Sequence, residues 1–191
     1  MRAGLARDAR ITTLLAGFGA DFARTEHRVT LAGEGAEAKL LGAYFPNGEQ
    51  HHELWTVQDH QAPHTASDLL YKGALGGAGR ALYYGTIRVG PEARRTDAYQ
   101  SNRNLLLSGD ARVDTNPQLE IETNDVRCTH GATVGQVDPS QLFYLMSRGI
   151  PRPEAERLLV AGFFTEVLSR FGDEDAAPQL AEHVTEKLSN R

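Results

Sequence analysis

The chain has 191 residues, of which 40% are hydrophobic, and a formal net charge of −5 at pH 7. That length suits one domain, or one domain with a small appendage, and the hydrophobic share is enough for a packed core. The acidic balance argues against a nucleic-acid binder, because such proteins usually carry a basic patch or stripe. No apolar run reaches the roughly 18 residues of a membrane span, and no polybasic cluster suggests a membrane anchor. Cys128 is the single cysteine, which excludes an internal disulfide framework and favours a reducing cytoplasm.

Residues 11–133 carry short apolar runs separated by Gly, Asn and Asp. Runs such as RVTLAG, HELWTV, LYYGTIRV and PQLEIET are typical of strands, and no amphipathic helical segment interrupts them. Gly73 and Gly85, twelve residues apart, each stand two residues before an aliphatic residue. This pattern predicts an all-β body and leaves a sandwich, a barrel and a β-solenoid open.

The pattern becomes helical near Asp138, which is a candidate N-cap followed by Pro139 at the first helical position, with Gly149 as the stop. A second helix is expected from about Pro153 to Phe171, with Gly172 beyond its end. We expect one face of it to be apolar, formed by Leu158, Leu159, Phe163, Val167 and Phe171, and expect Leu159 and Phe163 to be buried. A third helix is expected in residues 173–191, with Leu180, Val184 and Leu188 spaced four apart.

Several short motifs fail as functional signatures. GALGGAGRA (residues 73–81) lacks the Gly-Lys-Ser/Thr ending of a phosphate-binding loop, so we interpret its glycines as turn residues between strands. Histidines cluster in residues 51–64, but Pro63 and the strand-like neighbourhood argue against a helical ligand pair. Glu120 and Glu122 would share one strand face, which is a weak candidate for an acid–base pair.

Cys128 and His130 form the remaining candidate site. On a strand, alternate residues point the same way, so Val126, Cys128 and His130 share one face. Spacing alone favours a buried inner face, because free cysteine behaves as a small hydrophobe. The alternative is a soft thiolate and an imidazole that project together toward a metal. One thiolate and one imidazole make half a site, so a second chain would have to complete it.

The stretch from Val113 to Phe164, VDTNPQLEIETNDVRCTHGATVGQVDPSQLFYLMSRGIPRPEAERLLVAGFF, closely resembles the SufB/SufD family of iron–sulfur cluster assembly scaffolds. The likeness extends upstream through residues 64–75 and 85–108 and covers most of the chain. NPQLEI and CTHGATVGQVD are similar to SufD-type chains. SufB-type chains carry a cluster-related cysteine where this chain has Ala111, which argues against an independent cluster-building role.

The resemblance implies a mainly β chain: a right-handed β-helix over residues 1–137 and a small C-terminal helical domain over residues 138–191. It also implies a scaffold rather than an enzyme, paired with a SufB-type subunit and docked to the ATPase SufC through its helices. No cofactor is expected to stay bound to the chain alone; an iron–sulfur cluster would form transiently in the complex. His130 would be the cluster-interface group and Cys128 its neighbour. The residues expected to dock the ATPase are Gln141, Phe143, Tyr144, Arg148, Ile150, Pro151, Glu154 and Phe164.

Family members are about twice this length, so the sequence is either the C-terminal half of such a protein or a short homologue. An uncapped first turn would expose strand edges, so we expect a homodimer when the chain is alone. Two alternatives stay open at this point: a self-associating structural β-helix without a metal role, and a carbohydrate-active β-helix that uses Glu120 and Glu122.

Overall fold

The computed structural model describes residues 1–172, 178, 182, 185 and 186, which form a parallel β-solenoid followed by helices. The strands are β1 (Arg2–Leu5), β2 (Arg10–Gly17), β3 (Phe22–Leu31), β4 (Glu37–Tyr44), β5 (His51–His60), β6 (Ala66–Leu75), β7 (Arg80–Val89), β8 (Thr96–Leu106), β9 (Arg112–Ile121) and β10 (Val126–Gln136). Within the described residues, the strands are followed by the helices α1 (Pro139–Ser147) and α2 (Arg152–Phe171). The mainly β fold with a helical C-terminal part is therefore confirmed.

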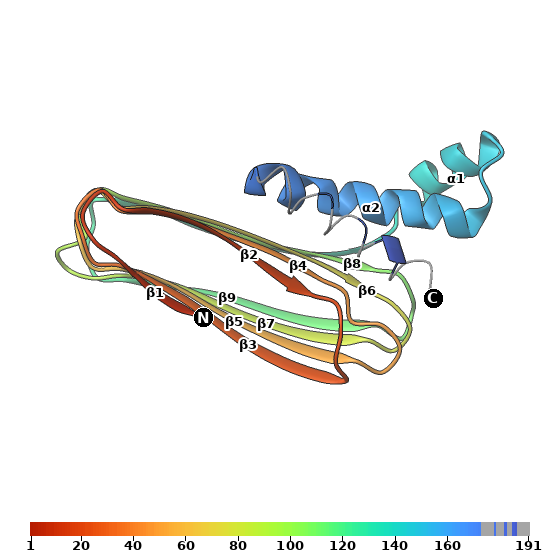
Figure 1. The fold of residues 1–191 in the computed structure, drawn as a ribbon, viewed down its shortest axis with the longest axis horizontal. Coiled ribbons are helices and arrows are strands. Elements are labelled where there is room, and N and C mark those ends of the chain that lie inside the picture. The colour runs from red at the N-terminus through yellow and green to blue at the C-terminus, as the bar shows by residue number, and fades with distance from the viewer. Residues whose placement is uncertain (173–177, 179–181, 183–184, 187–191) are drawn as a thin grey trace.

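The strands alternate between two sheets, so that each turn of the chain adds one strand to each sheet. One sheet has the order β1-β3-β5-β7-β9 and the other the order β10-β8-β6-β4-β2, and every pairing is parallel. Figure 1 shows the two sheets as two layers that face each other. The strands β3, β5 and β7 begin at residues 22, 51 and 80, a spacing of 29 residues. The twelve-residue spacing of Gly73 and Gly85 is not this repeat, because the two glycines lie on different sheets.

The interior of the solenoid is filled by side chains that stack from one turn to the next. The side chains of Tyr44, Tyr71 and Tyr83 are fully buried there. Glycines make room for these rings: a Cβ on Gly42 would lie 2.7 Å from the ring of Tyr71, and one on Gly73 would collide with the ring of Tyr44. Gly42 and Gly73 are therefore explained by close packing of the turns.

Polar side chains in the interior are paired with one another. The imidazole of His60 is hydrogen-bonded to the hydroxyls of Thr65 and Ser67, both at 2.8 Å. The imidazole of His27 is hydrogen-bonded to the hydroxyl of Tyr71 at 2.8 Å. Burial lowers the pKa of both histidines to about 4, so both imidazoles are neutral in the fold at pH 7.

The caps expected from the sequence are present in both helices. The carboxylate of Asp138 accepts a hydrogen bond from the backbone N–H of Ser140 at 2.8 Å and caps α1. Gly149 follows α1 with a φ of 86°, and Gly172 ends α2 in the left-handed conformation with a φ of 71°. The last strand ends at Gln136 and α1 begins at Pro139, but the division into two domains stays a prediction.

Helix α2 lies along the outer face of the sheet that contains β2, β4 and β6 (Figure 1). It buries Ala155, Val160, Phe164 and Val167, and the last three pack with Leu41, Ala43, Phe45, Leu70 and Ala74. The predicted apolar face was therefore correct in part. Val167 is buried, and Phe163 and Phe171 are half-buried at the edge of this cluster. Leu159 is only half-buried and Leu158 is exposed. Two apolar stripes lie side by side on this helix, and spacing alone does not distinguish them.

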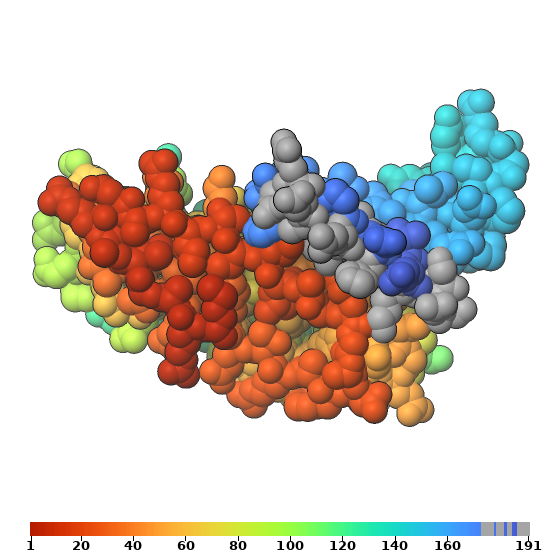
Figure 2. Space-filling model, viewed as in Figure 1, coloured from red at the N-terminus to blue at the C-terminus, as the bar shows by residue number. Residues whose placement is uncertain are grey.

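The expected third helix lies mostly outside the described residues, including Leu180, Val184 and Leu188. Within the described part of the chain, no helix has the length and apolarity needed to cross a membrane. Figure 2 shows the first turns of the solenoid facing the viewer, with the residues of α1 and α2 at the upper right.

Candidate functional site

The last turn of the solenoid is open. In the described residues β9 and β10 each end a sheet, so one hydrogen-bonding edge of each strand faces outward. The residues of these strands that continue the inner face are not covered by a further turn. Apolar side chains are therefore exposed there, including Leu119, Ile121 and Val134. Exposed apolar surface next to two free strand edges is a typical contact surface for another chain.

Cys128 and His130 lie on this open inner face. In the parallel register, Cys128 pairs with Ala98 and His130 with Gln100, and both partners are buried inside the solenoid. The sequence-based expectation that the two residues share a face is therefore correct, and the face is the inner one. Because no described turn covers it, Cys128 is only half-buried and His130 is exposed.

The surroundings of the two side chains differ. Cys128 packs against an apolar cluster that includes Ile87, Val89 and Ala98. Burial raises the pKa of its thiol above the ordinary value, so the thiol stays protonated at neutral pH. A protonated thiol is a poor metal ligand, whereas the exposed imidazole of His130 can be reached by a partner chain. The arrangement favours His130 as the reactive group of the pair.

The described residues do not contain a complete metal site: no group of three or more His, Cys, Asp or Glu side chains comes together among them. The histidines of residues 51–64 lie on β5 or the turn after it, not on a helix. His52 is hydrogen-bonded to the backbone oxygen of Gly19 at 2.8 Å, and His60 is paired inside the solenoid as described above. These hydrogen bonds give His52 and His60, the two buried histidines of the cluster, a structural role.

Glu120 and Glu122 do not form the pair that an acid–base mechanism would need. Strand β9 ends at Ile121, so only Glu120 lies within a strand. The Glu120 carboxylate faces Arg88 at 3.9 Å, in an ion pair with both side chains exposed. An exposed ion pair of this kind is a solvated surface feature.

A second candidate surface lies on the helices. No residue of α1 is buried, and α1 contacts α2 but has no extensive contact with the described strands. Phe143 is 73% exposed, which is unusual for so large an apolar side chain, and Tyr144 and Met146 are exposed as well. We call α1 and the first turn of α2, residues 139–156, the helical arm.

Most residues expected to dock an ATPase are accessible on the arm. Gln141, Phe143, Tyr144, Arg148, Pro151 and Glu154 are exposed, and Ile150 is half-buried. The guanidinium of Arg148 lies 5.2 Å from the centre of the Tyr144 ring, a cation–π contact that holds both side chains at the surface.

Phe164 does not belong to this surface. Its side chain is 1% exposed and packs edge-on against Phe18, with ring centres 6.5 Å apart. The expectation that Phe164 contributes to an exposed docking surface is therefore wrong. Its place in the sequence, three and four residues from Val167 and Val160, matches the buried stripe of α2.

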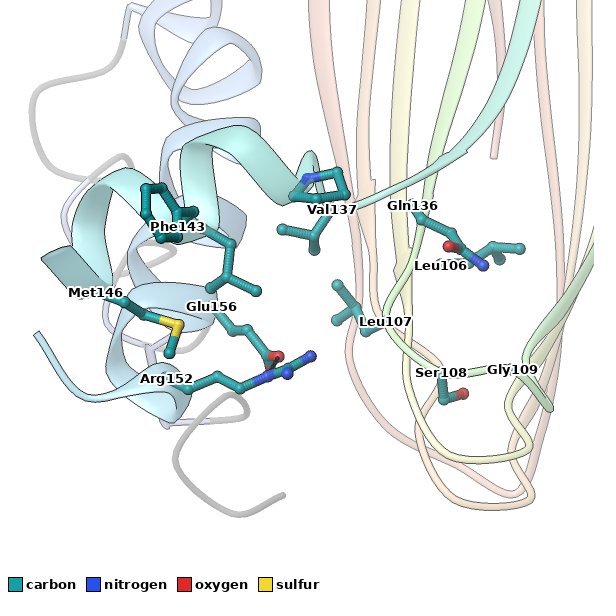
Figure 3. Close-up of a pocket in the computed structure, with 12 residues that line it drawn as sticks. Leu106, Leu107, Ser108, Gly109, Gln136, Val137, Phe143, Met146, Arg152 and Glu156 are labelled. Atoms are coloured by element: carbon teal, nitrogen blue, oxygen red, sulfur yellow. Dashed lines mark hydrogen bonds and ion pairs between the residues drawn. The ribbon is translucent and has the colours of Figure 1, made fainter.

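A groove of about 440 Å³ separates the helical arm from the end of the solenoid (Figure 3). Its lining includes Leu106, Leu107, Gln136, Val137, Leu142, Phe143, Met146, Arg152 and Glu156. Arg152 and Glu156 are joined by a hydrogen bond of 3.0 Å. Except for Phe143, sequence reasoning did not assign these residues to a site. The available signal was the pair of apolar residues Leu142 and Met146, which stand four positions apart in α1.

The fold and these two surfaces define a β-solenoid protein with an open last turn and an exposed helical arm. The chain belongs to the SufBD family: residues 1–163 match the family described as "SUF system FeS cluster assembly, SufBD core domain". It is similar to an iron–sulfur cluster assembly SufBD family protein of Mycobacterium leprae, with 39% identity over 188 residues, 94% of this chain and 47% of the relative.

Two curated SufD proteins are also similar. The iron–sulfur cluster assembly protein SufD of Escherichia coli is 35% identical over 158 residues, covering 83% of this chain and 37% of the relative. SufD of Bacillus subtilis is 35% identical over 164 residues, covering 86% and 38%. The chain therefore spans less than half the length of these relatives.

Proposed function

We propose that this chain acts in iron–sulfur cluster assembly as a SufD-like scaffold without catalysis of its own. Its open last turn pairs with a SufB-type subunit, and its helical arm docks the ATPase SufC. Family membership supports the general role. The observation that carries the proposal is that Cys128 and His130 lie on the inner face of an uncovered turn, between two free strand edges.

The partner would complete both the sheets and the ligand set. The free edges of β9 and β10 are 10 and 11 residues long, which is long for strand edges exposed to water. A partner that adds strands here would also cover Leu119, Ile121 and Val134. Its own side chains would then face His130 and could supply the ligands that the described part of this chain lacks.

The cluster is cargo in this proposal and not a resident cofactor. The imidazole of His130 would offer one nitrogen lone pair to iron. Cys128 would stay a neutral thiol while the turn is packed, because its pKa is raised by burial. Opening of the contact would expose the thiol to water and lower that pKa.

The helical arm suits an ATPase partner because its large apolar residues Phe143, Tyr144 and Met146 are exposed. Phe143 and Met146 line the groove next to the solenoid. Tyr144 and Gln141 line a second pocket, together with Leu145 of α1 and Leu159 of α2. Leu106, Leu107 and Gln136 also line the groove, so a docked protein would touch the ends of β8 and β10 as well.

The experiment is co-purification of the chain with a SufB-type subunit and with SufC, using one variant for each surface. Val134→Asp places a charge on the open turn and should abolish binding of the SufB-type subunit while leaving SufC bound. Phe143→Asp should do the reverse, so each variant is the control for the other. Binding of neither partner by the unchanged chain would overturn the proposal. His130→Ala should leave both complexes intact and reduce cluster supply in cells.

When no partner is present, we propose that the chain forms a homodimer. The edges of β9 and β10 are 10 and 11 residues long, so we expect two copies to pair through the last turn. Size-exclusion chromatography with light scattering at tens of micromolar should give a dimer, and Val134→Asp should give a monomer. A monomeric unchanged chain would contradict self-association without affecting the proposed pairing with SufB.

A further inference from the structure

Gln100 on β8 lies directly beneath His130 on the inner face of the solenoid. The parallel register places Gln100 between two neighbours, His130 on β10 and Leu69 on β6. Gln100 is fully buried, whereas His130 lies on the open turn. Gln100 and His130 are therefore neighbours across the boundary between the buried interior and the open last turn.

The side-chain amide of Gln100 is fixed on one side and unpaired on the other. Its Nε2 donates a hydrogen bond to the backbone oxygen of Gly85 at 3.3 Å. A Cβ on residue 85 would lie 2.5 Å from this nitrogen, so glycine is what permits the approach. The Oε1 atom of Gln100 is buried without a hydrogen-bond partner among the described residues. A buried acceptor without a donor is unfavourable, and such atoms usually have a specific explanation.

Of the two strand neighbours, only His130 can supply the missing donor. Leu69 has no polar hydrogen, while a neutral imidazole always carries one N–H. Thr115 is a rival, because its hydroxyl is also buried and unpaired. Thr115, however, lies in register with Tyr83 on the opposite sheet and is not a strand neighbour of Gln100.

We propose that Gln100 is a positioning residue for His130: the imidazole turns inward from the exposed position that it has in this structure, its N–H reaches the unpaired Oε1, and this contact fixes which ring nitrogen is protonated. The other ring nitrogen then presents its lone pair to the open turn. Histidines that bind metal ions are commonly oriented in this way, by a carbonyl or carboxylate that accepts the second ring N–H. The use of that lone pair for iron rests on the proposed function, whereas the contact itself does not.

The test is nitrogen NMR of the ¹⁵N-labelled chain, which reports the tautomer of each imidazole from its long-range ¹H–¹⁵N couplings. At a pH of about 8.5 a solvent-exposed imidazole is neutral. We expect a single tautomer of His130 with an N–H that exchanges slowly with water. Gln100→Met removes the acceptor at similar volume and should give a tautomer mixture and faster exchange. Gln100→Glu retains an Oε acceptor but loses the Nε2–H that bonds to Gly85, so it should restore the single tautomer only in part.

Two variants control for general loosening of the core. Gln58→Met removes another fully buried glutamine with an unpaired Oε1, but Gln58 is in register with Val29 and Ile87, not with His130. It should leave the His130 tautomer unchanged, and so should Thr115→Val. An unchanged tautomer in Gln100→Met, or the same change in Thr115→Val, would overturn the proposal.

Measurement of cluster supply in cells separates this inference from the proposed function. If Gln100→Met alters the His130 tautomer and also lowers cluster supply, both stand. If the tautomer changes while cluster supply is full, the positioning contact is supported and the assigned use of His130 fails.

Discussion

Lys72 on β6 and Glu166 on α2 form an ion pair of 2.6 Å at the contact between the sheet and the helix. Lys72 is 5% exposed and also donates a hydrogen bond to the backbone oxygen of Phe163 at 2.8 Å. Glu166 additionally faces Arg103 at 3.2 Å and Arg170 at 2.8 Å. The hydrogen bond from Lys72 is the main cause that lowers the pKa of the Glu166 carboxyl. This carboxylate therefore joins α2 to strands β6 and β8.

Glu166→Gln should destabilise the fold, because Lys72 would remain buried without its counter-ion. Charge-assisted hydrogen bonds contribute about 1.5–3 kcal/mol, and we expect a loss in that range from urea unfolding. Asp97→Asn is the matched control, since Asp97 pairs with Arg127 at 2.6 Å but both side chains are exposed. The control should cost less than about 1 kcal/mol. Equal losses in the two variants would contradict a special role for Lys72 and Glu166.

Phe164→Ala should lower stability more than any other aromatic substitution on the helices. Its side chain fills the contact with Phe18 and the outer face of the sheet, and such truncations cost about 3–5 kcal/mol. Phe143→Ala, on the exposed arm, should change stability by no more than about 0.5 kcal/mol. Thermal or urea unfolding measures both, and a larger loss for Phe143 would show that α1 is packed in solution.

Acid should destabilise the solenoid through His60. Its pKa is about 4 in the fold and near 6.5 when unfolded, so the unfolded state binds the extra proton between these values. The burial of neutral His60 therefore contributes its full share of the unfolding free energy above about pH 6.5. Roughly 2 kcal/mol of that free energy is lost by pH 5. His60→Gln should flatten the dependence of unfolding free energy on pH, whereas substitution of the exposed His64 should not. If the unfolding free energy depends on pH equally in His60→Gln and in the unchanged chain, His60 is not the cause of the acid destabilisation.

The features that could be predicted from the sequence are those set by local chemistry. Asp138, Gly149 and Gly172 mark helix ends by capping and by positive φ, and these depend only on neighbouring residues. The shared face of Cys128 and His130 follows from strand geometry in the same way. The strand pattern alone does not distinguish a solenoid from a barrel, because turns of unequal length obscure the 29-residue repeat. Only the family resemblance predicts the solenoid.

Other features depend on packing between distant segments. The buried face of α2 is set by Lys72 and the apolar residues of β4 and β6, which stand far from it in sequence. That contact favours Phe164 over Phe163 as the buried ring. Likewise, no local sequence feature indicates that β10 is the last strand of its sheet. Strand geometry therefore predicts the inner face for Cys128 but not its partial exposure.

Hydrogen exchange of the backbone amides tests the central claim most directly. The chain is measured alone and with a SufB-type subunit, and exchange is compared strand by strand. Pairing through the open turn should slow exchange in β9 and β10, including the stretch around His130, and leave β1 and β2 unchanged. Protection of β1 and β2 instead, or an unchanged β10 in a stable complex, would contradict the claim that the last turn is the partner surface.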